Sequence, residues 1–212
     1  MKTAGAVEIK AFTVVAATLM LLPRLTWAHH FMDNQLPQTF TQGFLSGLGH
    51  PVIGADHAAF VIAAGFLLAL IKRGMWGVFA LILGSLLGAA LHLAGFNLPS
   101  GEAAVALSVI LIGALVMAGR RIPLSWMAAG LALAGVLHGH AYAEFIFGAE
   151  PMPLGAYLAG FCLVQLGIAT ASFLLHRRLI AATASHARLA SSALGAVVGA
   201  IGVLFLANSM VV

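Results

Sequence analysis

Charged residues and cysteines are both scarce in this chain. Of its 212 residues, 8 % are charged and one is a cysteine, whereas 62 % are hydrophobic and the mean hydropathy is +1.06. Because a soluble domain is about a quarter charged, this composition excludes a soluble globular protein and indicates an integral membrane protein. The lone Cys162 excludes a disulfide framework or a thiolate metal cluster within one chain, and we expect it to be a small buried apolar residue.

Basic residues give the chain a net charge of +4, but they do not form a patch of the kind that binds nucleic acid. They occur as short pairs between apolar runs, where such residues act as topology signals. We therefore expect the lipid bilayer, and not a nucleic acid, to be the partner of this surface.

The first 28 residues have the composition of a secretory signal sequence. A basic start is followed by a short apolar core at 11–23 and by small residues up to Ala28 that suit cleavage. This core is short for a membrane span. Arg24, just beyond it, is unusual in a signal and leaves an uncleaved anchor as the alternative. Cleavage after Ala28 would make His29 the new N-terminus.

Six longer apolar segments follow, each near the length that crosses ~30 Å of hydrocarbon. Lone strands cannot satisfy their backbone in lipid, so all six are predicted to be helices of an all-α polytopic membrane protein. The predicted spans are 51–71, 74–96, 101–119, 123–142, 153–175 and 189–208. They form a domain of residues 51–212 after an outward-facing segment at 29–50, in which 40–49 is expected to be a helix at the membrane interface. Small residues four apart, at Gly84/Gly88 and Gly195/Gly199, should serve helix packing.

Lysine and arginine residues indicate how these spans are oriented. Seven of them fall in loops on one side and none on the other, which places the seven on the inner side under the positive-inside rule. They are Lys72, Arg73, Arg120, Arg121, Arg177, Arg178 and Arg188. The mature N- and C-termini are then both expected to face outward.

Histidines and acids sort the opposite way, although the positive-inside rule does not constrain them. The residues that map to the outer half are His29, His30, His50, His57, His92, His138, His140, Asp33, Asp56, Glu102, Glu144 and Glu150. Only His176 and His186 lie on the inner side, beside arginines. This distribution predicts an outward-facing pocket that is rich in imidazole and carboxylate.

Residues 50–57, His-Pro-Val-Ile-Gly-Ala-Asp-His, carry the most informative pattern in this pocket. Ionisable groups inside lipid are expensive and usually face a partner, a cavity or an ion path. Pro51 suits the first turn of a helix with His50 at its cap, which would place His57 on the same face as His50. Asp56 would coordinate a metal directly or accept the second ring N–H of a ligating histidine. A buried Asp–His pair that only ties helices together is the alternative.

A second polar group ends the fourth predicted span. His140 and Glu144 are four residues apart and share a helix face, whereas His138 points elsewhere, in a direction that suits His57. Tyr142 has a hydroxyl that suits a hydrogen bond to a ligand. An interfacial polar rim is the alternative explanation.

The remaining candidates have weaker patterns. His92 and Glu102 flank a short outer loop, where an interfacial histidine and an acid favoured by the helix dipole are equally good explanations. His29 and His30 would begin the mature chain and chelate a divalent metal, unless they belong to a disordered polar start. Gln165, near the middle of the fifth span, would help a dehydrated ion pass or only form a hydrogen bond between helices.

The available ligand types narrow the choice of metal. Nitrogen and oxygen ligands without thiolate disfavour Cu(I), and several imidazoles disfavour Mg²⁺ and Ca²⁺, which take oxygen shells. Ni²⁺, Co²⁺, Zn²⁺, Mn²⁺ and Fe²⁺ remain, and no organic cofactor is indicated.

These residues resemble the signature of the HupE/UreJ family of nickel/cobalt permeases, His-Pro-x-x-Gly-x-Asp-His followed by seven residues and a Gly. The matching positions are His50, Pro51, Gly54, Asp56, His57 and Gly65. The fourth span fits a second family stretch, His-Gly-x-Ala-His-Gly, less closely. There His138, Gly139 and Ala141 match, but Tyr142 and Ala143 replace the later His-Gly, and Gly148, Ala149 and Glu150 match a branch with a later Gly-Ala-Glu.

The resemblance implies a secondary permease, not an enzyme, that moves Ni²⁺ or Co²⁺ inward across a bacterial inner membrane. We expect His29 and His30 to capture the ion, His50, Asp56 and His57 to form the central site, and His138, His140 and Glu144 to complete it. No nucleotide-binding motif is present, so an ion gradient, the membrane potential or a separate partner would drive uptake. Protonation of imidazole competes with metal, so uptake should fall at acid pH.

Several questions stay open at this stage. A homo-oligomer and an indirect link to maturation of a downstream nickel or cobalt enzyme are both compatible with the chain. An intramembrane metalloenzyme with Glu144 as general base is one alternative function. A haem-binding electron carrier with His57 and a histidine of the fourth span as axial ligands is the other.

Overall fold

The computed structural model describes residues 35–99 and 101–211, and all the regular secondary structure in this part of the chain is helical. The helices are α2 (Phe40–Ile53), α3 (Ala55–Leu68), α4 (Met75–Leu93), α5 (Gly101–Ala118), α6 (Leu124–Glu144), α7 (Pro151–Ala182) and α8 (Ala184–Ser209). The predicted signal sequence and the predicted ligands His29 and His30 lie outside the described residues. The all-α prediction is confirmed for the described part.

Four of these helices are long and apolar enough to cross a membrane: α4, α5, α7 and α8. A fifth span results if α2 and α3 are counted as one broken span. α6 has 21 residues but is more polar because its last turns carry His138, His140 and Glu144. The protein is therefore a multi-pass membrane protein. α7, with 32 residues, extends well beyond the predicted span at 153–175 and carries Arg177 and Arg178 near its C-terminal end.

The first predicted span, 51–71, is wrong as a single helix. α2 continues through Pro51 and ends at Ile53, and α3 begins at Ala55 after a bend of 78°. Proline lacks the N–H for a helical hydrogen bond, and Gly54 at the junction has an extended backbone (φ −69°, ψ 103°). Pro51 therefore stands in the last turn of α2 and not in the first turn of a new helix, and His50 is not a helix cap.

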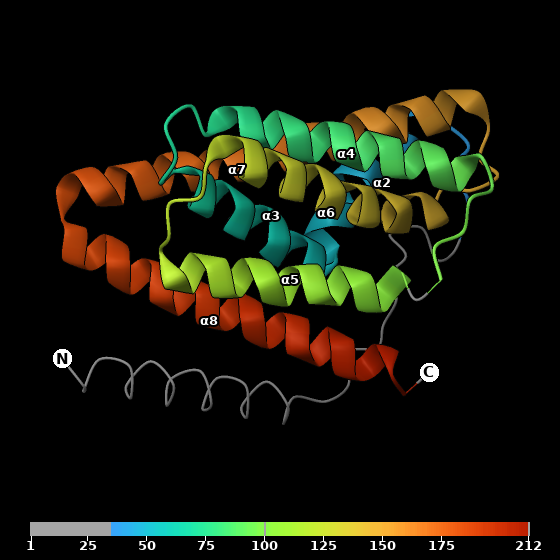
Figure 1. Cartoon of the computed structure of the whole chain (residues 1–212). Helices are drawn as coiled ribbons and strands as arrows, with labels where there is room; N and C mark the ends of the chain where they lie inside the picture. The colour runs from blue at the N-terminus through green and yellow to red at the C-terminus, as the bar shows by residue number, and fades with distance from the viewer. Residues whose placement is uncertain (1–34, 100, 212) are drawn as a thin grey trace.

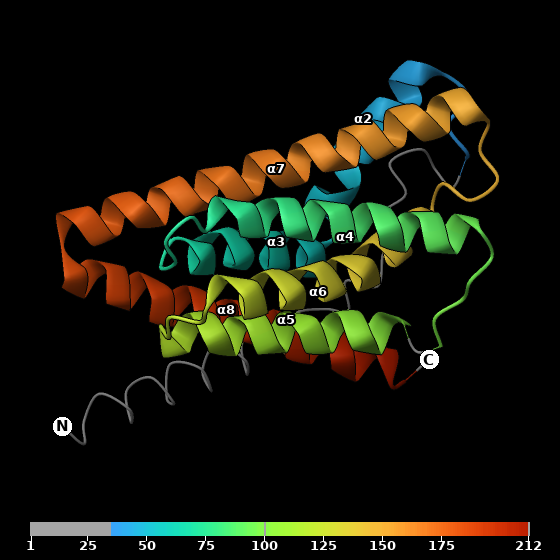
Figure 2. The same ribbon diagram turned by 45° about the horizontal axis from the view of Figure 1, so that its top comes forward.

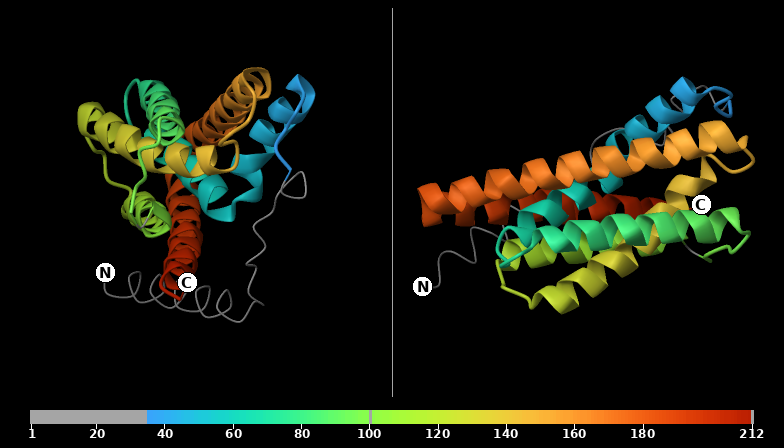
Figure 3. Two further views of the ribbon diagram at one scale, coloured as in Figure 1. Left: turned by 90° about the vertical axis from the view of Figure 1, so that its right-hand side faces the viewer. Right: turned by 90° about the horizontal axis from the view of Figure 1, so that it is seen from above.

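α3 is the central helix, and three close-packed pairs surround it. The pairs are α4 with α6, α5 with α8, and α2 with α7, and α3 contacts α4, α5, α7 and α8. The end-on view in Figure 3 shows the three pairs as separate groups around α3. In Figure 2, α2 lies beside α7 and runs towards the start of α3. Eleven of the 14 residues of α3 are buried, which makes it the most enclosed helix of the described chain.

Glycines allow the helices of each pair to approach closely. A Cβ atom added at Gly84 of α4 would lie 2.2 Å from the Ala132 carbonyl oxygen of α6, and one added at Gly113 of α5 would lie 2.6 Å from the Gly199 nitrogen of α8. Small residues at such spacings are the usual means of helix contact in membranes. The packing role predicted for Gly84 and Gly199 is thus confirmed.

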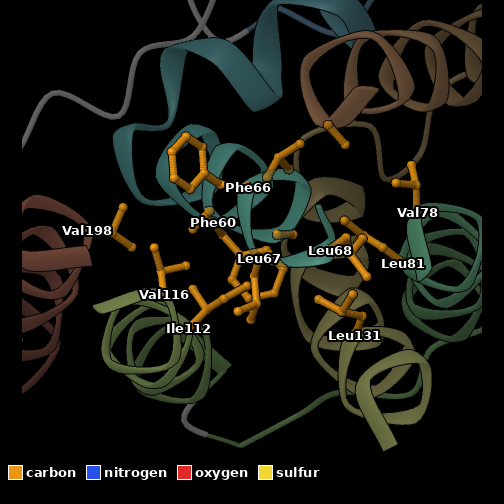
Figure 4. Packing of buried hydrophobic residues seen from close by; sticks show 14 of the residues in the cluster. Phe60, Phe66, Leu67, Leu68, Val78, Leu81, Ile112, Val116, Leu131 and Val198 are labelled. Atoms are coloured by element: carbon orange, nitrogen blue, oxygen red, sulfur yellow. The ribbon is translucent and has the colours of Figure 1, made fainter. Parts of the chain in front are cut away.

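Two clusters of buried apolar side chains fill the bundle. The larger one is built on α3, with Phe60, Leu67 and Leu68 packed against Leu81 and Ile112 (Figure 4). The smaller one joins α6 and α7 and is rich in aromatic side chains: Ala89, Tyr142, Ala143, Ile146, Tyr157 and Phe161. The His138 ring contacts Phe60 of the first cluster (centroids 4.3 Å apart) and the Tyr142 ring of the second (6.5 Å). Polar groups therefore separate the two apolar regions.

The two ends of the bundle differ in chemistry. In Figure 1 the α3–α4, α5–α6 and α7–α8 connections lie at the left end, and these carry or adjoin the lysines and arginines. The α4–α5 and α6–α7 connections lie at the right end, next to His92, Glu102 and Glu144. The sorting of basic residues away from histidines and acids is thus a property of the folded bundle.

Candidate metal site

A buried pair of histidines forms the centre of the site. His57 in the first turns of α3 and His138 on α6 place their Nδ1 atoms 2.8 Å apart, and their side chains are 8 % and 1 % exposed. Two nitrogens bound to one metal at about 2.1 Å, with ordinary ligand angles of about 90–110°, would be about 3.0–3.4 Å apart. A small movement would therefore let both imidazoles bind one ion. No porphyrin plane fits between nitrogens this close, which argues against axial haem ligation by this pair.

Ser108 of α5 orients the His138 ring. Its hydroxyl donates a hydrogen bond to the Val105 carbonyl oxygen (2.7 Å) and also lies 2.9 Å from His138 Nε2. Because the single hydroxyl proton points to Val105, Nε2–H of His138 donates to the Ser108 oxygen. His138 then presents an unprotonated Nδ1 towards His57, the tautomer that a metal requires. Sequence reasoning missed Ser108, because a serine in an apolar helix gives no signal of a contact 30 residues away.

Asp56 lies beside this pair at the start of α3. It is 8 % exposed, and its carboxylate lies within electrostatic reach of His57 and Tyr142. A Cβ atom added at Gly54 would lie 3.3 Å from Asp56 Oδ1 and 2.7 Å from His57 Cδ2. Both side chains therefore pack over the bare Cα of Gly54, and the break between α2 and α3 holds them together.

His50 joins the same group through ring contacts. Its ring centroid lies 6.1 Å from that of His57 and 5.4 Å from that of Tyr142. His50, Asp56, His57 and His138 are hereafter called the deep cluster. The bend at Gly54, and not a continuous helix face, brings His50 and His57 together.

A second group lies at the end of the bundle. Ligand atoms of His92 on α4 and of His140 and Glu144 on α6 all lie within 4.8 Å of one another, and we call these three residues the rim cluster. His140 Nε2 donates to the Phe96 carbonyl oxygen (2.8 Å), which leaves its Nδ1 facing Glu144 Oε1 at 3.9 Å. His140 is buried, His92 is half-buried and the Glu144 side chain is 59 % exposed. The rim cluster thus offers two imidazoles and a carboxylate next to solvent.

Other predicted residues lie elsewhere. Glu102 is exposed in the first turn of α5 and is not part of the rim cluster. Gln165 is buried on α7, and its side-chain oxygen lies 3.2 Å from the Ser85 hydroxyl, a contact between helices α7 and α4. His176, in the C-terminal half of α7, hydrogen-bonds the Phe66 carbonyl oxygen and stacks on the Phe66 ring, as a structural histidine would.

Comparison with known proteins adds the family. The sequence profile described as HupE / UreJ protein matches residues 17–205, nearly the whole chain. The chain belongs to the HupE/UreJ family. This is a transporter-type family, generally related to nickel and cobalt transport, and not a family of enzymes. The resemblance predicted from residues 50–65 is thereby confirmed.

One curated relative defines the similarity further. Protein HupE of Rhizobium leguminosarum bv. viciae is 31 % identical over 137 residues, which cover 63 % of this chain and 66 % of that protein. The match thus spans slightly less than two thirds of the relative's length. No solved structure matches the chain.

The structure gives physical roles to the glycines of the HupE/UreJ signature. Gly54 makes room for His57 and Asp56, as described above. Gly65 lets α3 approach α7, because an added Cβ would lie 2.2 Å from the Ala169 carbonyl oxygen. The signature therefore combines candidate ligands with the packing that fixes the helix carrying two of them.

Proposed function

We propose that this protein is a secondary permease that carries Ni²⁺ or Co²⁺ inward across the bacterial inner membrane, with its mature termini in the periplasm. α2 and α3 together, α4, α5, α6, α7 and α8 form its six spans. The observation that carries the proposal is the buried His57–His138 pair beside Asp56. Imidazoles and a carboxylate enclosed by apolar helices suit a divalent transition metal.

The broken span favours a cation at this position. The C-terminal end of α2, the negative end of its dipole, comes to the deep cluster, and discontinuous helices place such ends at ion sites in transporters. Asp56 stands in the first turn of α3, where the positive end of the dipole stabilises a carboxylate. The C-terminal end of α2 and the Asp56 carboxylate thus supply negative charge where the histidines converge, while the N-terminal end of α3 stabilises that carboxylate.

The rim cluster suits the first encounter with the ion. Glu144 is exposed and attracts cations from the aqueous phase, while His92 and His140 behind it are the next ligands. The ion would pass from the rim cluster to the deep cluster, both of which draw a histidine from α6. Ion paths with several moderate sites let an ion enter and leave. His29 and His30, outside the described residues, remain proposed capture ligands.

Uptake of ⁶³Ni²⁺ into proteoliposomes tests this function. The purified protein should take up the ion against a protein-free control, and His57→Ala or Asp56→Ala should abolish most of that uptake. His186→Ala is the matched control. His186 is exposed near the start of α8, among the basic residues and away from the two histidine clusters. If both His57→Ala and Asp56→Ala took up the ion as the wild type does, the assignment of the ion site to the deep cluster would be wrong.

A further inference from the structure

Tyr142 has a polar group that the fold leaves unused. Its side chain is 0 % exposed, and its hydroxyl has no hydrogen-bond partner among the described residues. Buried hydroxyls are nearly always hydrogen-bonded, because an unpaired one has lost its water without compensation. An exception of this kind calls for a functional explanation.

The position of Tyr142 supplies that explanation. Its ring lies among three imidazoles, with centroids 4.6 Å from His57, 5.4 Å from His50 and 6.5 Å from His138. Asp56 lies within electrostatic reach of the phenol. The unpaired hydroxyl therefore belongs to a residue whose ring adjoins all three histidines of the deep cluster.

Tyr157 is a useful contrast in the same apolar cluster. It is also buried, and its hydroxyl donates a hydrogen bond to the Tyr142 carbonyl oxygen at 2.8 Å. Tyr157 thus holds the backbone of α6 in place with its polar group. Tyr142 has a similar environment but no such structural task within the described chain.

We propose that the Tyr142 hydroxyl holds a water ligand of the cation in the deep cluster and thereby selects cations that keep such a ligand. This inference rests on the proposed function. His57 and His138 offer two nitrogen ligands, and His50 and Asp56 lie beside them. Even with all four residues bound, this set does not exceed the four ligands that Zn²⁺ usually takes in proteins. An ion that takes more ligands must add water, and a buried hydroxyl without a partner, on a ring that adjoins three imidazoles, suits a hydrogen bond to that water. Tyr142 is therefore a positioning and selectivity residue.

Two single-atom deletions test the proposal. Purified wild-type protein, Tyr142→Phe and Tyr157→Phe are titrated with Ni²⁺ and with Zn²⁺ by calorimetry, and their thermal unfolding is recorded without metal. Tyr142→Phe should bind Ni²⁺ about 10–100-fold more weakly, the usual effect of removing an outer partner of a metal site, with little change for Zn²⁺. Its unfolding temperature should equal or exceed that of the wild type, because no hydrogen bond is lost. Tyr157→Phe should instead unfold at a lower temperature.

Bound Co²⁺ gives an independent signal. Loss of a water ligand lowers the coordination number, and Co²⁺ with four ligands absorbs visible light more strongly than Co²⁺ with five or six. The visible bands of Co²⁺ in Tyr142→Phe should therefore intensify relative to the wild type.

The outcomes separate this inference from the proposed function. Unchanged Ni²⁺ affinity in Tyr142→Phe, or equal losses for Ni²⁺ and Zn²⁺, would overturn the role of the hydroxyl. A lower unfolding temperature or a failure to fold would overturn it as well, because the hydroxyl would then be holding the structure. If the wild-type protein itself bound neither Ni²⁺ nor Co²⁺, the proposed function would fail together with this inference.

Discussion

Replacing Gly54 by alanine should disable metal binding although it removes no candidate ligand. The added Cβ would lie 2.7 Å from His57 Cδ2, whereas carbon atoms in contact are about 3.5–4.0 Å apart. The His57 ring would have to move by ~1 Å. It has little freedom to do so, because its ring already contacts those of His138 and Tyr142, with centroids 4.9 Å and 4.6 Å away. The movement would disturb the present geometry of His57 Nδ1 and His138 Nδ1, which are 2.8 Å apart.

The change in stability caused by Gly54→Ala is the sum of two opposing contributions. Overpacking a tight site costs about 1–3 kcal/mol of stability, while replacing glycine by alanine offsets about 0.4–1 kcal/mol because it reduces the freedom of the unfolded chain. The protein should therefore still fold. Displaced ligands and their partners typically weaken metal binding about 10–100-fold, which corresponds to ~1.4–2.7 kcal/mol of binding free energy.

The assay pairs metal titration with thermal unfolding of the purified protein, and Gly130→Ala is the matched control. Gly130 lies in α6, and an added Cβ there would have no heavy atom within 4 Å. Gly130→Ala should keep Ni²⁺ affinity and gain slightly in stability. If Gly54→Ala bound Ni²⁺ as tightly as the wild type while folding normally, the packing of His57 over Gly54 would not control the site, and the reasoning would be refuted.

Two further predictions follow from the contacts of the site. Ser108→Ala removes the acceptor for His138 Nε2–H. Ni²⁺ affinity should therefore fall about tenfold or more, and the free energy of unfolding should fall by about 0.5–1.5 kcal/mol. Metal titration and thermal unfolding measure these two effects, and an unchanged Ni²⁺ affinity would contradict the tautomer assigned to His138. Uptake should decrease as the pH is lowered from neutral into the acid range, because a protonated imidazole has no lone pair with which to bind a metal. Measurement of ⁶³Ni²⁺ uptake at a fixed membrane potential checks this, and an increase at acid pH would contradict it.

Hydropathy and charge predicted a large part of this fold. The long apolar segments became helices near the predicted bounds, for example α5 at Gly101–Ala118 against 101–119. The sorting of lysine and arginine away from histidine and acid reappears at the two ends of the bundle. These features are local or additive along the chain, so the sequence contains them directly.

Features that depend on direction in space were not predictable in this way. The bend at Gly54 leaves the hydropathy of 40–71 almost unchanged, so a span and a broken span look alike in sequence. The proximity of His138 to His57 was anticipated, but the pairing of His92 with His140 depends on how α4 lies against α6. Ser108 gave no sign of its role, because its hydroxyl also has a partner in its own helix.

The deep cluster lies between two separately packed parts of the bundle, and this bears on how metal binding would affect the protein. His138 belongs to α6, which is held to α4 so closely that a Cβ at Gly139 would lie 1.9 Å from the Ser85 carbonyl oxygen. His57 belongs to α3, which is packed against α7 at Gly65. An ion bound to both Nδ1 atoms would join these two parts where only side-chain contacts join them otherwise. Because a ligand stabilises the state that binds it, occupancy of this site would stabilise the arrangement of α3 and α6 seen here.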